Sequence, residues 1–172
     1  MPTHLPQLIQ HCLLRELASL RRELAAYPDE RQIWQLPAGL PNSTGTLILH
    51  LAGNLRHFVG AVLGGSGYNR DRDFEFAARD LPRERLLAEI QAAEEAIRGT
   101  LPRLSAEELA ADFPEPLRGH TVATSDMLLQ LATHLAYHLG QVSYHRRLVT
   151  GNAEGVGALS PAELSTARPA ST

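Results

Sequence analysis

The segment from Thr124 to Thr150 constrains the fold most, because it joins a long helical pattern to histidines on the side that should be buried. At about 100° per residue, the residues within one arc of roughly 100° from His134 are mainly apolar but include further histidines and a glutamine. They are Met127, Leu131, His138, Gln141, Val142, His145 and Val149. A buried helix face holds polar side chains only where something satisfies them. This face therefore predicts a polar site inside a helical protein.

The length and composition favour one soluble domain. A chain of 172 residues can bury a core without disulfides, and its only cysteine, Cys12, excludes thiolate metal clusters and fits the cytoplasm. A net charge of -3 with interspersed signs leaves no basic stripe for nucleic acid. We also expect no membrane association, because no run approaches the roughly 20 apolar residues of a membrane span.

Hydrophobic periodicity predicts an all-α fold. The four long amphipathic helices are expected at about 5–26, 46–63, 82–101 and 124–150. The connection after the third helix has room for a short helix at 105–111 and a small hairpin near 117–122. The connections between the second and third helices and between the third and fourth helices are long. Residues 1–150 are therefore expected to form a four-helix bundle with crossover loops. Residues 151–172 are poor in large apolar side chains and are expected to form a flexible tail.

Two histidines of the last helix are candidate metal ligands. His134 and His138 are four residues apart, so their rings lie one helical turn apart on one face. A third ligand must come from another helix, and His50 stands at the edge of an apolar stripe there. Three imidazoles suit Zn²⁺, Ni²⁺ or Fe²⁺ and leave a coordination position open. The alternative is that these histidines are only hydrogen-bonded core residues.

Other polar residues have two interpretations each. Gln141 could hold a ligand or water by hydrogen bond, or cap a neighbouring backbone group. His57 and His145 could line the pocket or pack at helix ends. Arg70 and Arg72 could hold an anionic part of a substrate, or lie in a solvated loop paired with nearby acids. No residue is assigned as a catalytic acid, base or nucleophile.

At these residues the chain resembles the DinB superfamily, the DinB/YfiT-like metalloenzymes. The two stretches that carry the resemblance are HLAYHLGQVSYHRRL and LILHLAGNLRHFVGAVLGGSGYNRDRDFEF. The resemblance implies a four-helix bundle of up-down-down-up topology, often dimeric. It also implies a divalent metal held by one histidine of the second helix and two of the fourth, which here are His50, His134 and His138.

The resemblance implies chemistry only in outline. Characterised relatives include enzymes that use the low-molecular-weight thiols mycothiol or bacillithiol, and others are described as hydrolases. We therefore expect a metal-dependent thiol S-transferase or hydrolase acting on a small molecule. The alternative is a non-catalytic, metal-stabilised dimeric stress or scaffold protein. A homodimer is suggested by the small-residue back of the last helix and by Gly53 and Gly60, which would let another backbone come close.

Overall fold

The computed structural model describes residues 5–158 and 160–170, and this part of the chain is helical without named strands. The α-helices are α1 (Leu5–Ala25), α2 (Thr44–Leu55), α3 (Arg72–Ala77), α4 (Arg83–Thr100), α5 (Ala106–Ala110) and α6 (Thr124–Thr150). The remaining helical elements are the 3₁₀ helices η1 (Glu30–Trp34), η3 (Leu101–Arg103) and η4 (Pro161–Glu163), and the π-helix η2 (Arg56–Leu63).

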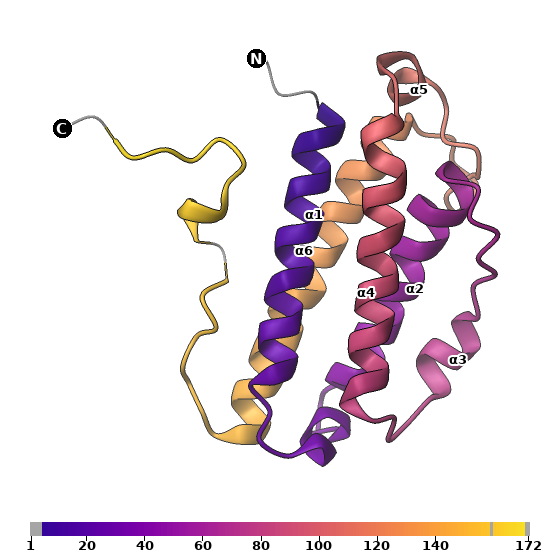
Figure 1. Ribbon diagram of the computed structural model, residues 1–172. Coiled ribbons are helices and arrows are strands. Elements are labelled where there is room, and N and C mark those ends of the chain that lie inside the picture. Colours follow the sequence, from indigo (N-terminus) through magenta and orange to yellow (C-terminus); the bar gives the residue numbers. More distant parts are fainter. Residues whose placement is uncertain (1–4, 159, 171–172) are drawn as a thin grey trace.

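The four long helices lie side by side around one apolar core. In Figure 1, α1 and α6 run in one direction, whereas α2 and α4 run in the other. Helix α1 packs against α4 and α6, and α2 packs against the same two helices. Because α2 and α4 are parallel, the chain must cross the length of the molecule between them, and α3 lies on this crossover against α2. The crossover thus brings a short polar helix alongside α2.

Periodicity predicted the long helices well, except the second. Helices α1, α4 and α6 match the expected ranges to within a residue, and α5 appears where a short helix was expected. The second helix begins at Thr44, where the Ser43 side chain accepts a hydrogen bond from the Thr46 amide, and changes to the π-helix η2 after Leu55. Isolated π turns are frequent at functional sites. Helix α3 was not predicted, because six polar-rich residues are too short for a periodic pattern.

Helix α2 with η2 is the buried centre of the protein. The prediction that no segment approaches a membrane span is wrong for Thr44–Leu63, which is 20 residues long and apolar enough to cross a membrane by length and composition. In the structure, 67% of its apolar window is buried inside the protein. The apolar composition is therefore explained by packing, since a helix enclosed by its neighbours is apolar on nearly all sides.

The buried face of α6 is rotated from the predicted one. Its centre is a row of apolar residues, namely Leu128, Leu131, Leu135, Leu139 and Val142. His134 and His138 lie at the edge of this row and are only partly buried, and Gln141 is exposed. The prediction that Gln141 shares the buried face is wrong, because the packing of α1 and α2 on the leucines sets the face. The two histidines consequently border both core and solvent.

The described part of the tail returns to α1. Gly151 ends α6 in a left-handed conformation with φ 69°, which favours glycine. Farther on, the Glu163 carboxylate forms an ion pair of 3.3 Å with Arg22 of α1. The buried Arg146 guanidinium donates to the carbonyls of Asn152 and Glu154. The last helix thereby holds the first residues of the tail.

Candidate metal centre

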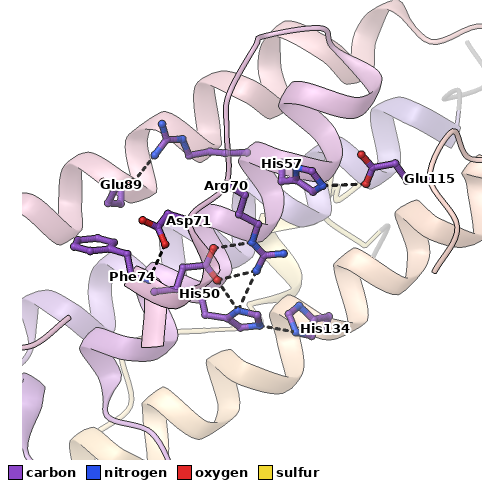
Figure 2. Close-up of polar contacts among 10 residues, drawn as sticks. His50, His57, Arg70, Asp71, Phe74, Glu89, Glu115 and His134 are labelled. Carbon is purple, nitrogen blue, oxygen red and sulfur yellow. Dashed lines mark hydrogen bonds and ion pairs between the residues drawn. The ribbon is translucent and has the colours of Figure 1, made fainter. Parts of the chain in front are cut away.

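Three imidazoles from two helices converge at the edge of the core. One ring nitrogen each of His50, His134 and His138 can be chosen such that all three lie within 4.8 Å of one another. The Nε2 atoms of His50 and His134 are 3.3 Å apart, and the ring centroids of His134 and His138 are 4.6 Å apart. Figure 2 shows His134 facing His50 from the opposite helix. The structure thus brings together the three histidines that the sequence analysis selected.

Two of the rings, those of His50 and His138, have hydrogen-bond partners on the side away from the cluster. His50 Nδ1 lies 3.1 Å from Glu75 Oε2 and 3.2 Å from Arg70 Nη2, and in the tautomer with the proton on Nδ1 it donates to the Glu75 carboxylate, which can only accept. His138 Nδ1 lies 2.6 Å from Gln141 Oε1 and donates to that oxygen. In both rings Nε2 is then left with a free lone pair. A histidine that donates its other N–H to a carboxylate or carbonyl oxygen is the usual arrangement of a metal ligand.

A buried ion pair stands behind His50. Arg70 donates to both Glu75 oxygens at 2.7 and 2.8 Å, and its guanidinium also lies 3.2 Å from His50 Nδ1 (Figure 2). Burial would raise the pKa of Glu75, but the hydrogen bonds from Arg70 and His50 outweigh burial and lower the pKa. Glu75 therefore stays ionised and orients the His50 ring. The Phe76 ring packs against the same imidazole, with the two ring centroids 5.0 Å apart.

The other two histidines are kept neutral. Burial, together with the neighbouring His138 and His50, lowers the pKa of His134 to about 4. Burial also lowers the pKa of His138, against the opposing effect of its hydrogen bond to Gln141. Neutral imidazole is the form that binds metal, so no proton has to be displaced from these rings near pH 7.

Two cavities flank the histidines, and both reach them. A cavity of about 710 Å³ is lined by His50 and His134 and extends over Asn54, Phe58 and Arg72. Another, of about 520 Å³, is lined by His138 and Gln141 and is mostly apolar. Within the described residues, the cluster has no fourth histidine, cysteine or carboxylate ligand. The donor set fits a three-histidine metal site with room for a further small ligand.

The remaining candidates take different positions. Arg70 forms an ion pair with Glu75, so the prediction of an arginine paired with a nearby acid is confirmed. The pair is buried and supports His50, however, and does not lie in a solvated loop. Arg72 lines the larger cavity, with its guanidinium 4.9 Å from the Phe76 ring centroid. His57 is hydrogen-bonded to Glu115 at 3.0 Å.

His145 belongs to a separate buried network. Its Nδ1 lies 2.8 Å from the Tyr27 hydroxyl and 3.1 Å from the Thr44 hydroxyl, and its Nε2 donates to the Gln35 carbonyl at 2.8 Å. Burial lowers the pKa of His145, so this ring packs as a neutral structural group. Neither His57 nor His145 belongs to the cluster of His50, His134 and His138.

Gly53 makes room for the Glu75 carboxylate. A Cβ at this position would overlap Glu75 Oε1 and lie 2.8 Å from Glu75 Cδ. We predict that Gly53→Ala lowers the metal affinity about 10- to 100-fold, the usual loss when a ligand's supporting group is displaced. The loss should occur although alanine favours a helix by about 1 kcal/mol.

The measurement is competition with a chromophoric chelator. Gly140→Ala in α6 is the control, because a Cβ there meets nothing within 4 Å. Unchanged affinity in the Gly53 variant would show that Glu75 does not support His50.

Comparison with known proteins gives a family without an assigned activity. Neither the search of curated proteins nor the search of solved structures found a match. A family model described as protein of unknown function (DUF1572) matches residues 9–156, which include all three clustered histidines. The chain therefore belongs to the DUF1572 family of proteins of unknown function.

Proposed function

We propose that this protein is a metal-dependent enzyme of the DinB superfamily, of the thiol S-transferase or hydrolase type, acting on a small molecule in the cytoplasm. The observation that carries the proposal is the convergence of three imidazoles beside a cavity. The helix directions agree with the up-down-down-up bundle expected for that superfamily.

The residues fit a divalent transition ion such as Zn²⁺, Ni²⁺ or Fe²⁺. His50, His134 and His138 would hold it, and three nitrogen ligands leave a position for substrate. When bound, such an ion lowers the pKa of a coordinated water or thiol and so supplies a nucleophile near neutral pH. Glu75 and Gln141 fix the ring orientations, so the site needs little rearrangement to bind.

The protein's own groups around the larger cavity supply binding and proton handling. Phe58 and Leu131 give the cavity an apolar wall that excludes water from one side of the site. The Glu115 carboxylate lines the cavity and is hydrogen-bonded to His57 Nε2. This pair can hold or accept a proton from a bound substrate.

A second candidate function is a metal-stabilised homodimer without turnover. It is favoured by the outer side of α6, where Tyr137, Tyr144 and Leu148 are 66%, 76% and 62% exposed. Exposed apolar side chains on one helix face are suited to contact with another subunit. Light scattering of the purified protein tests the dimer separately from the chemistry.

The proposal is tested on protein purified without a polyhistidine tag. Elemental analysis should find about one transition metal per chain, and the metal-loaded protein should accelerate transfer of a small thiol to monochlorobimane or hydrolysis of an activated ester. His138→Ala should lose both metal and rate. Equal rates in the two proteins would contradict enzymatic use of the metal, and bound metal without either activity would favour the dimer.

A further inference from the structure

The larger cavity carries positive charge that the protein itself does not neutralise. Arg70 is paired with Glu75 at 2.7 Å, and Glu115, whose side chain is hydrogen-bonded to His57 at 3.0 Å, contributes one carboxylate to the cavity lining. Two further arginines line the cavity, Arg72 and Arg118, and both are exposed. In the part of the chain that the structure describes, neither lies within ion-pair distance of a carboxylate. An anion entering this cavity would therefore meet two arginines without an acidic partner, against the single carboxylate of Glu115.

Arg118 is presented by a tight turn. Leu117 and His120 exchange two backbone hydrogen bonds of 2.8 Å, which leaves Arg118 and Gly119 as a two-residue loop. Their φ angles are 46° and 84°, the positive values that a type I′ turn requires. A positive φ is costly for arginine, where asparagine or glycine is usual. The turn fixes the backbone of Arg118 beside the cavity that Arg72 of α3 also lines.

Asn54 lines the same cavity and has a side-chain oxygen without a hydrogen-bond partner. Its side chain is only 8% exposed, and its buried Oδ1 has no hydrogen-bond partner. Buried polar atoms are nearly always paired with protein or with ordered water, so this oxygen lacks a donor that a water or a ligand beside Asn54 can supply. Asn54 follows His50 by one helical turn, which places the two side chains about 5–6 Å apart at Cβ. The missing donor is therefore expected close to the three histidines.

We propose that this cavity binds a small organic acid as the substrate of the metal site. An N–H or O–H of the acid donates to Asn54 Oδ1, and its carboxylate lies between the guanidinium groups of Arg72 and Arg118. The cavity volume, about 710 Å³, suits such a ligand, and Phe58 and Leu131 contact its apolar part. The inference rests on the proposed function, because the reacting group of the acid is placed at the histidines.

The inference is tested by binding to the Co²⁺-loaded protein, because a thiol that joins the cobalt changes its absorption spectrum. The probes are N-acetylcysteine, its neutral amide and 3-mercaptopropionic acid, which keeps the carboxylate but lacks the N–H. N-acetylcysteine should bind about tenfold more tightly than its amide, as expected for charge-assisted hydrogen bonds at a partly exposed site.

Two sets of variants separate the contributions. In Arg72→Gln/Arg118→Gln the preference for the acid over the amide should fall to about one- to twofold, whereas Arg98→Gln on the exposed side of α4 should keep it. Asn54→Ala should weaken N-acetylcysteine about three- to tenfold and leave 3-mercaptopropionic acid unchanged. Both arginines are exposed or at a turn, so the double variant should bind Co²⁺ as the unaltered protein does.

The outcomes distinguish the two proposals. Failure of the protein to bind Co²⁺ would overturn the proposed function and this inference with it. Bound Co²⁺ with equal affinities for acid and amide, or with no spectral response to any probe, would overturn the inference alone. A preference for the acid that survives in the double arginine variant would also overturn it.

Discussion

Replacing any one of the three clustered histidines with alanine should lower the affinity for Zn²⁺ by more than about a hundredfold, because loss of a supporting group alone costs 10- to 100-fold. The substitutions are His50→Ala, His134→Ala and His138→Ala. Each leaves two imidazoles, too few to hold the ion against water. Competition with a chromophoric chelator measures the dissociation constants.

His120→Ala is the matched control for these variants. His120 lines the same cavity but lies on the exposed turn, outside the cluster. Stability gives an independent readout, because a ligand at 100 times its dissociation constant stabilises the folded form by about 2.7 kcal/mol. A chelator should therefore lower the melting temperature of the unaltered protein and not that of the three variants. If it leaves the unaltered protein unchanged, the histidines are only hydrogen-bonded core residues.

Arg146→Met should destabilise the protein by about 3–5 kcal/mol, the cost of leaving a buried charge without its partner. Arg146 and Glu23 are each 1% exposed, and Arg146 Nε donates to Glu23 Oε2 at 2.5 Å. Methionine fills the space but leaves the carboxylate buried and unpaired. Urea unfolding measures the loss, which corresponds to a fall of roughly 10 °C in melting temperature for a chain of this size.

The double variant Glu23→Leu/Arg146→Met separates the charge effect from packing. Removing both partners of a buried ion pair is often neutral or stabilising, so it should recover most of the lost stability. It should not restore the hydrogen bonds from Arg146 to the carbonyls of Asn152 and Glu154. Proteolysis of the tail should therefore be faster in both variants. A double variant as unstable as the single one would show that packing, not charge, sets the cost.

The sequence predicts those parts of this protein that depend on one helix at a time. The ranges of α1, α4 and α6 follow from apolar residues at helical spacing, and the spacing of His134 and His138 places both rings on one side of α6. The sequence also indicates His50 as the third ligand, because it borders the apolar stripe of the second helix. The cluster confirms that these three side chains converge.

The support of the site could not be predicted, because it depends on the crossover between α2 and α4. Helix α3 is too short to show a period, although Asp71, whose side chain accepts from the Phe74 amide, is a recognisable N-cap. The sequence pattern therefore does not distinguish Glu75 from the other acidic residues of this polar segment. Glu75 can support His50 because Gly53 has no side chain to occupy the space of its carboxylate and because Arg70 pairs with it. Only the folded chain brings these residues together.

The position of the three histidines has a consequence for the lifetime of the fold. His50 and His134 are separated by 84 positions along the chain, and both lie on long helices of the core. An ion held between them would act as a removable cross-link that closes about half of the chain into a loop, which would restrict the unfolded chain as a disulfide does. Global opening would then require the ion to leave first, so the rate of unfolding would follow the supply of free metal around the protein.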